Sequence, residues 1–372
     1  MYIQVIFFLT IFSVMLLGFH FLLYFSIITF FEISELAIKN GLLALFFVLA
    51  CSFVLSTVFA HWNDNIITRI YYVFSSVWMG VLASLLAGSF FVWIIILINK
   101  IFHLNISSKY SAIVFFVFFL IVLIFGIFSA FDFRIKNIEV SIKNLPESWE
   151  GKTIIQLSDV HLGLVNRLFF ARKINELVNS VDHDMVVITG DLFDGQAGDL
   201  GYFVSPLNDI KAEHGIYYVT GNHETYYGTE KTYDILSKTK ITSLKDELVE
   251  IDGLQIIGIS FPERYEKKNM KETLESIDNL DIDKPNILLY HEPVLIESIS
   301  KTGIDLMLAG HTHRGQMWPF RYITHIMYKG YDYGKYVIGD FTLYVSNGTG
   351  TWGPPIRTFN KPEIVAIKLK RK

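Results

Sequence analysis

The stretch Met185-Val186-Val187-Ile188-Thr189-Gly190-Asp191-Leu192-Phe193-Asp194 places two carboxylates directly after a short apolar run. The run has the length and composition of a buried β-strand, so both carboxylates follow the carboxyl end of that strand. A Gly-Asp pair at such a place is more often a turn or a helix cap, because both residues are favoured there for backbone reasons. An Asp at a strand end can also hold one cation or bridge two. The interpretation therefore depends on what the neighbouring strands carry.

The segments on both sides of this stretch repeat the same arrangement of a short β-rich run followed by polar residues. The runs predicted as strands are 138–142, 153–157, 185–188, 216–219, 255–259, 286–290, 305–309, 342–345 and 364–369. Residues 168–178 have the spacing of an amphipathic helix. Strand 153–157, this helix and strand 185–188 form a β-α-β unit, which favours parallel pairing. We expect the last run, 364–369, to close the sheet.

Metal-competent side chains follow five of these predicted strands. They are Asp159, His161, Asp191, Asn222, His291, His311 and His313. Sheets of α/β proteins place their sites beyond the carboxyl ends of strands, so we expect these side chains to converge. Asp159 and His161 are two residues apart, as are His311 and His313. On an extended segment this spacing points both side chains of a pair to the same face.

The ligand types narrow the choice of metal. Imidazoles and oxygen ligands without a thiolate suit Mn²⁺, our first choice, or Fe or Zn²⁺ better than a structural zinc cage. There are too many ligands for one tetrahedral ion with an open position. Two ions about 3.5–4 Å apart would clamp the attacking and leaving oxygens of an in-line displacement and acidify a bound water. Hydrolysis of a phosphoester is the reaction class that this arrangement favours.

Five ordered motifs together resemble the calcineurin-like metallophosphoesterases. They are Asp159-x-His161, Gly190-Asp191-x-x-Asp194, Gly221-Asn222-His223-Glu224, His291 and Gly310-His311-x-His313. The resemblance covers about residues 151–372, and with Gly-Thr-Trp-Gly-Pro-Pro-Ile-Arg at 350–357 it is similar to a membrane-anchored, bacterial-type branch. It implies a four-layer α/β/β/α sandwich.

The resemblance also implies roles for single residues. Asp159, His161 and His313 would hold one ion, Asn222, His291 and His311 would hold the other, and Asp191 would bridge them. His223 would sit over the phosphate with Asp194 orienting it, while a hydroxide held by the metals attacks phosphorus. Gly195 stands where the protein Ser/Thr phosphatases carry an Arg that grips phosphate. This departure favours a diester or a pyrophosphate over a phosphoprotein.

The first third of the chain has a different composition. Of the 372 residues 52% are hydrophobic and 18% charged, and the excess lies in four apolar runs at about 3–30, 42–60, 71–98 and 112–130. Each run has the roughly 20 residues needed to cross a bilayer, and their number and length argue against a signal peptide. We predict a four-helix, all-α transmembrane domain (1–132), a connecting strand and linker (133–152) and an α/β metallophosphoesterase domain (153–372).

An even number of crossings places the N-terminus and the catalytic domain on one side of the membrane. Basic residues near the ends of the runs divide evenly between the two sides and do not decide which side this is. We expect a multi-pass protein of a bacterial cell membrane, with the catalytic domain in the cytoplasm. The net charge of −4 argues against a nucleic-acid partner, which would call for a basic surface.

The expected function is a membrane-anchored phosphodiesterase or pyrophosphatase, with the lipid bilayer as partner and a lipid-linked phosphoester as candidate substrate. The alternatives are a phosphatase acting on a soluble substrate and a catalytically idle membrane sensor or scaffold. An idle domain would be expected to lack a ligand or His223, and the sequence keeps them all. Glu224 is expected to support or cap rather than to bind metal, Arg357 either lines the site or belongs to a turn, and the oligomeric state is left open.

Overall fold

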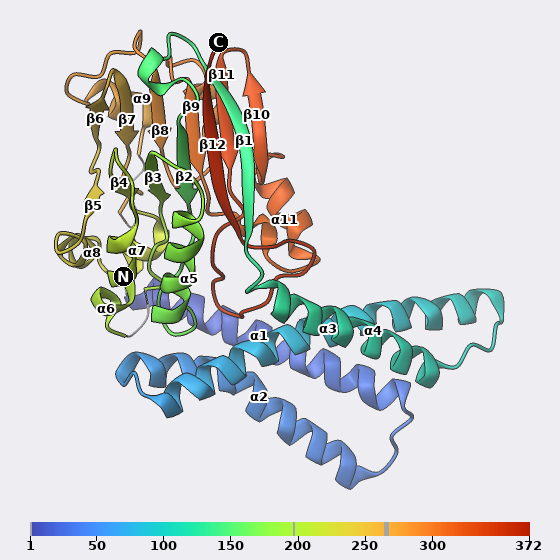
Figure 1. Cartoon of the computed structure of the whole chain (residues 1–372). Coiled ribbons are helices and arrows are strands. Elements are labelled where there is room, and N and C mark those ends of the chain that lie inside the picture. Colours follow the sequence, from blue (N-terminus) through green and yellow to red (C-terminus); the bar gives the residue numbers. More distant parts are fainter. Residues whose placement is uncertain (1, 196–197, 264–267) are drawn as a thin grey trace. The chain divides into compact units, whose positions relative to one another are not determined.

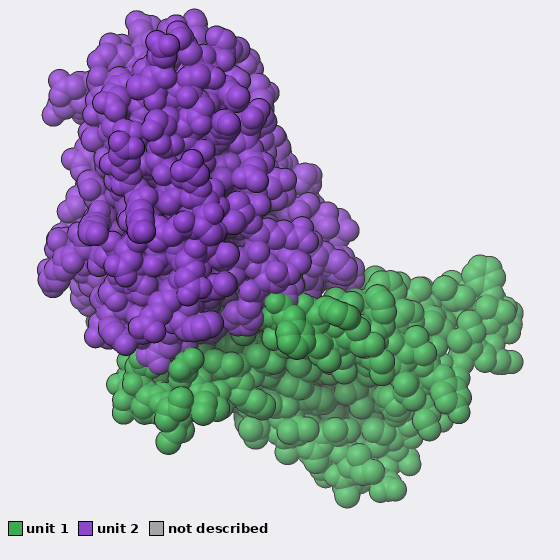
Figure 2. Space-filling model, viewed as in Figure 1, with its two compact units in different colours: residues 1–128, 353–356 green, residues 129–352, 357–372 purple. Residues whose placement is uncertain are grey.

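The computed structural model describes residues 2–195, 198–263 and 268–372, with side chains from residue 10 onward. The chain divides into two compact units, residues 1–128 with 353–356 and residues 129–352 with 357–372 (Figure 2). The domain limits expected from the sequence stay a prediction.

Four long apolar helices form the first unit. They are α1 (Tyr2–Phe30), α2 (Leu36–Trp62), α3 (Ile66–Phe102) and α4 (Ser108–Ser129). All four are long and apolar enough to cross a membrane, which confirms the four helices predicted from the apolar runs. Asn65 caps α3 by accepting hydrogen bonds from the backbone N–H groups of Ile67 and Thr68, so the turn between α2 and α3 is well defined.

Hydrogen bonds between polar side chains join the helices of this unit. The Nδ1–H of His20 donates to the carbonyl of Leu16 at 2.8 Å, and its Nε2 accepts from the indole N–H of Trp78 at 2.9 Å. Trp93 donates in the same way to the hydroxyl of Ser26 at 3.0 Å. His20 thus serves helix packing, because both of its ring nitrogens have partners within the helices.

Two six-stranded mixed sheets form the second unit (Figure 1). The first has the order β1-β12-β2-β3-β4-β5, with β1 (Arg134–Ile142), β12 (Glu363–Arg371), β2 (Thr153–Leu157), β3 (Met185–Thr189), β4 (Ile216–Val219) and β5 (Ile241–Ser243). The second has the order β10-β11-β9-β8-β7-β6, with β10 (Gly334–Ile338), β11 (Phe341–Val345), β9 (Leu306–Ala309), β8 (Asn286–Leu289), β7 (Leu254–Gly258) and β6 (Glu247–Ile251). β2, β3 and β4 are parallel to one another, as are β7, β8 and β9.

Short helices complete the second unit. They are α5 (Leu168–Asn179), α6 (Leu200–Val204), α7 (Asn222–Tyr227), α8 (Thr229–Leu236), α9 (Met270–Glu275), α10 (Ile296–Ile299) and α11 (Phe320–Met327), with 3₁₀ turns at Glu147–Trp149, Ser205–Asp209 and His313–Gly315. One apolar cluster fills the space between the sheets. A second packs α5, α6 and α8 on the first sheet, and a third packs α9 and α10 on the second sheet. The predicted four-layer α/β/β/α sandwich is confirmed.

The position of β12 differs from the prediction. This strand does not close an edge but lies between β1 and β2, parallel to the first and antiparallel to the second. Its alternate residues belong to different apolar clusters, Ile364 and Ala366 to the outer one and Val365 and Ile367 to the inner one. A strand that is buried on both faces needs the continuous apolar run that β12 has.

Candidate metal centre

The predicted ligands lie beyond the carboxyl ends of strands from both sheets. Asp159 and His161 follow β2, Asp191 follows β3 and Asn222 begins α7 after β4; His291 follows β8, and His311 and His313 follow β9. Parallel strands end at the same edge of a sheet, so each sheet delivers its ligands to one edge. The ligands of the two sheets then meet, because the Nε2 atoms of His161, which follows β2, and His313, which follows β9, are 3.0 Å apart.

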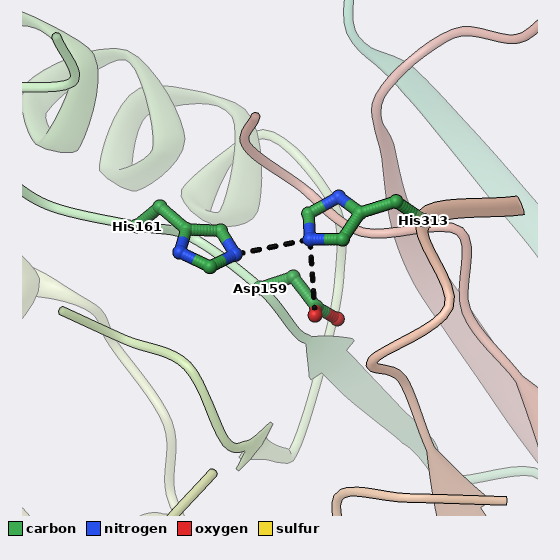
Figure 3. Close-up of side chains that lie close together, drawn as sticks. All are labelled: Asp159, His161 and His313. Atoms are coloured by element: carbon green, nitrogen blue, oxygen red, sulfur yellow. Dashed lines mark hydrogen bonds and ion pairs between the residues drawn. The ribbon is translucent and has the colours of Figure 1, made fainter. Parts of the chain in front are cut away.

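Asp159, His161 and His313 form the first group of ligand atoms (Figure 3). The Nε2 atoms of His161 and His313 are 3.0 Å apart, and His313 Nε2 is 3.3 Å from Asp159 Oδ1. All three side chains are buried. The Asp159 carboxylate also accepts from the Ser158 hydroxyl at 2.5 Å and from the backbone N–H of His311 at 3.0 Å. These bonds fix the carboxylate beside the two imidazoles.

Asp191, Asn222, His291 and His311 form the second group. His291 Nε2 lies 3.2 Å from both Asp191 Oδ2 and Asn222 Oδ1, and 3.1 Å from His311 Nδ1. The other ring nitrogen of His291, Nδ1, donates to the carbonyl of Thr189 at 2.8 Å, so Nε2 of the same ring faces the two acceptor oxygens. These oxygens call for a positive charge beside them, which either a proton on Nε2 or a divalent cation bound by the neutral ring can supply.

The Asp191 carboxylate touches both groups. Its Oδ2 is 3.2 Å from His291 Nε2 and 3.9 Å from His161 Nε2. Burial alone would raise the pKa of Asp191, but the imidazoles of His291, His223 and His161 hold this pKa well below its usual value. Burial would lower the pKa of His291, yet the carboxylates of Asp191 and Asp159 raise it to about 10. This part of the structure therefore attracts positive charge, while the role of these side chains as metal ligands stays a prediction.

His223 and Asp194 lie next to the first group. The Nδ1–H of His223 donates to the backbone carbonyl of Asp194 at 3.1 Å, and Asp194 Oδ1 is 3.5 Å from the same nitrogen. This carboxylate oxygen is also 3.4 Å from His161 Nδ1. Asp194 thus contacts two imidazoles, whereas only His223 was predicted as its partner. A carboxylate on the outer nitrogen of a ligating imidazole orients the ring and raises its basicity.

The backbone of five predicted ligands is in the left-handed region. Their φ angles are 53° for Asp159, 52° for His161, 50° for Asp191, 69° for His311 and 45° for His313. Residues with a Cβ rarely adopt this region, and each instance costs about 1 kcal/mol or more. Surrounding contacts must therefore hold these loops, and the sequence pattern gives no sign of this strain.

Glu224 holds two of these loops together. It is fully buried, and its carboxylate accepts hydrogen bonds from the backbone N–H groups of Gly221 at 2.7 Å, Phe193 at 3.0 Å and Asp191 at 3.1 Å. The first of these bonds closes the capping box of α7. Burial raises the pKa of Glu224, as does the neighbouring Asp191, while the backbone donors lower it. Glu224 supports the site without facing the ligand atoms, as expected.

A second support comes from Arg357. Its buried guanidinium donates through Nη2 to the carbonyls of Asn347 at 2.8 Å and Gly350 at 2.5 Å, and Nη2 is 3.2 Å from His313 Nδ1. Burial lowers the pKa of Arg357 to about 10, so the group remains charged at neutral pH. Arg357 therefore fixes the loop after β11 against His313, which combines the two roles left open by the sequence.

Two aromatic rings beside the site were not predicted from the sequence. The Phe261 ring lies 6.0 Å from that of His291, and the Tyr328 ring lies 5.9 Å from that of His311. Phe261 follows the end of β7, a position that could have been noticed, whereas Tyr328 has no such signal. Phe203 packs in the core, and the Tyr226 ring lies 5.6 Å from that of His223.

Comparison with known proteins finds a family model and several relatives that match this chain. A model of the family described as calcineurin-like phosphoesterase matches residues 152–315. An uncharacterized metallophosphoesterase of Campylobacter jejuni is 36% identical over 242 residues, which cover 64% of each chain. A transmembrane protein with metallophosphoesterase domain from Danio rerio is 31% identical over 253 residues, 64% of this chain and 57% of that one. An uncharacterized metallophosphoesterase of Aquifex aeolicus is 33% identical over 249 residues, 64% of this chain and 92% of that one. This chain thus matches less than two thirds of the length of the first two relatives.

Proposed function

Because this chain belongs to the calcineurin-like metallophosphoesterase family, we propose that it is a membrane-anchored, metal-dependent hydrolase of a phosphodiester or a pyrophosphate. The observation that carries the proposal is the position of Asp191 between two groups of imidazoles that come from both sheets. We propose two divalent ions as cofactors, with Mn²⁺ as the first choice and Fe or Zn²⁺ as alternatives.

The proposed roles of the residues follow their contacts. The two ions would supply a hydroxide nucleophile and neutralise charge on the phosphoryl group. Asp159, His161 and His313 would hold one ion, Asn222, His291 and His311 the other, and Asp191 would contact both. The bond from His223 Nδ1 to Asp194 leaves Nε2 available to bind a phosphate oxygen or to protonate the leaving oxygen.

We also propose that residues 1–132 anchor the enzyme in a bacterial cell membrane, that 133–152 link the domains and that 153–372 form the catalytic domain. The four membrane-capable helices support the anchoring, and a relative carries the word transmembrane in its name. With four crossings, the catalytic domain lies on the side of the N-terminus, which we assign to the cytoplasm. A lipid-linked phosphoester at the bilayer surface is the proposed substrate.

The test uses the full-length chain in detergent with Mn²⁺ and bis(p-nitrophenyl) phosphate. We expect turnover that falls at least 10³-fold in Asp191→Asn and 10²- to 10⁴-fold in His223→Ala. Asp283→Asn and His61→Ala are the matched controls, because both side chains are exposed and lie outside the site. Variants as active as their controls would contradict the assignment of the centre.

Metal content separates the enzyme from the idle alternative. Elemental analysis should find two ions for each chain of the wild type. Two bound ions without turnover of diesters, monoesters or pyrophosphates would favour a sensor or scaffold. To test the substrate class, an acylated diester in nanodiscs is compared with a soluble diester of the same leaving group, and equal kcat/KM values would favour a soluble substrate.

A further inference from the structure

Helix α11 carries its apolar side chains on the outside. The exposed fractions are 43% for Phe320, 52% for Ile323, 77% for Ile326 and 68% for Met327. At 100° per residue these four side chains share one side of the helix, and none of the eight residues of α11 is buried. A helix on the surface of a soluble domain normally buries such a stripe against the core. The orientation of α11 is therefore the reverse of the usual one.

Polar contacts hold the opposite side of α11 against the domain. His325 Nδ1 is 2.7 Å from Asp332 Oδ1, and the Tyr328 hydroxyl that follows the helix is 3.4 Å from Glu292 Oε1. The Tyr328 ring also contacts His311 of the candidate metal centre. The helix thus borders the site, and none of its apolar side chains is buried in the core of the domain.

This apolar patch is the densest of the described part of the second unit. Five large exposed apolar side chains fall within the eight residues of α11, the fifth being Tyr322. No other eight consecutive residues described in that unit carry more than two. Contiguous exposed apolar surface of this kind marks a contact with a membrane or with another protein.

The connection to the membrane helices favours the bilayer as the partner. α4 ends at Ser129 and β1 begins at Arg134, so only four residues separate the last membrane-capable helix from the first strand. Arg134 is in register with Glu363, whose carboxylate accepts from the hydroxyl of Tyr333 at 3.1 Å. Tyr333 lies only six residues after α11. The strand that continues from α4 and the segment that follows α11 therefore meet at one edge of the unit.

Charges around this edge suit anionic lipid headgroups. Arg134 and Lys136 are exposed at the start of β1, Lys329 is exposed just after α11, and Arg321 stacks on Tyr322 within it. We infer that α11 is an interfacial helix whose Phe320, Ile323, Ile326 and Met327 side chains lie in the headgroup boundary of the bilayer that holds α1–α4. The metal centre then opens beside lipid headgroups. This inference rests on the membrane anchoring in the proposed function.

The experiment places an environment-sensitive label on α11 in the full chain. Ile326→Cys is compared with Ile282→Cys in a Cys51→Ser background, since Cys51 is the only native cysteine. Ile282 is 54% exposed and lies outside α11, in the segment that precedes β8. Both proteins carry bimane and are reconstituted into nanodiscs of phosphatidylcholine and phosphatidylglycerol, with and without headgroup-proximal doxyl lipid.

We expect doxyl lipid to quench the label at 326 at least threefold more than the label at 282, and aqueous iodide to show the reverse order. Equal iodide quenching at the two positions would overturn the inference. A label at 326 that is shielded from both quenchers only when several chains share a nanodisc would assign the patch to a second copy of the chain and would also overturn it.

A kinetic comparison links the helix to the substrate. Ile323→Glu should raise the KM for a vesicle-embedded diester at least tenfold and leave kcat/KM for bis(p-nitrophenyl) phosphate unchanged, while Ile282→Glu changes neither. An unchanged KM on vesicles would contradict the inference. The quenching result does not depend on activity, so lipid-exposed labels in an inactive protein would refute the proposed function and leave the interfacial helix standing.

Discussion

Replacing Glu224 by Gln should weaken the centre through the backbone of two loops. The Gln carbonyl oxygen can still accept from Gly221 and Asp191, but its amide group then faces the N–H of Phe193, which is a second donor. Two charge-assisted hydrogen bonds become neutral, at about 1 kcal/mol each, and one buried donor loses its partner, at about 1–3 kcal/mol. Part of this loss is offset because Gln carries no buried charge. We expect a net loss of about 2–4 kcal/mol of unfolding free energy.

The assay is thermal unfolding of the full chain in detergent, followed by tryptophan fluorescence, together with Mn²⁺ titration. A loss of this size lowers the Tm by about 4–16 °C for a domain of this length. Displacement of the Asp191 backbone should also weaken Mn²⁺ binding about 10- to 100-fold. The matched control is Glu230→Gln, an exposed position in the first turn of α8, which should change stability by less than about 0.5 kcal/mol.

The same comparison in EDTA distinguishes two causes. If the hydrogen bonds of Glu224 hold the loops, the Tm difference between Glu224→Gln and Glu230→Gln persists without metal. A difference that vanishes in EDTA would mean that Glu224 acts by its charge on the bound ions. A Glu224→Gln protein with the Tm and the Mn²⁺ affinity of the control would refute the structural reasoning.

Three further predictions concern the same site. A Cβ on residue 310 would overlap the Ser158 hydroxyl and the Asp159 carboxylate, so Gly310→Ala should abolish Mn²⁺ binding, whereas Gly201→Ala should bind normally in the same calorimetric titration. Arg357→Lys removes most of the hydrogen-bond donors to the loop after β11 and should lower the free energy of unfolding by about 2–4 kcal/mol. The loss is measured as a fall in Tm that added Mn²⁺ does not restore. An unchanged Tm would contradict the role given to Arg357. The Tm of the wild type in EDTA should be about 5–11 °C lower than its Tm in Mn²⁺ at 100 times the Kd. Equal Tm values in EDTA and in Mn²⁺ would speak against a metal centre.

Much of the fold follows from the apolar pattern of the sequence. The strands that line the central core, such as β2 and β4, are continuous apolar runs with turn residues at their ends, and their predicted bounds match the structure. The edge strands β5, β6 and β10 were not predicted, because half-exposed residues at an edge leave no continuous apolar run. α11 was missed for a different reason: Phe320, Ile323 and Met327 have the i, i+3, i+7 spacing of an amphipathic helix, but the helix has only eight residues, which makes this pattern short.

The convergence of the candidate ligands was predictable from the sequence, but the contacts that support them were not. Residue types and strand ends indicated which side chains converge, because parallel strands deliver their carboxyl ends to one edge. The contacts of Glu224, Arg357 and Tyr328 depend on pairing between distant segments, which a single sequence does not show. The left-handed backbone of residues such as Asp159 is equally hidden, because Asp and His adopt it at only a small fraction of their positions, although more often than most residues with a Cβ.

The strained backbone has a consequence for how this protein tolerates genetic drift. At the five left-handed positions a glycine would relieve local strain, so a change that destroys the centre can stabilise the folded chain. Selection for folding alone would therefore erode positions such as Asp191 first. This chain has Asp or His at all five positions, against the preference of its own backbone, which is the arrangement that their proposed use as metal ligands would require.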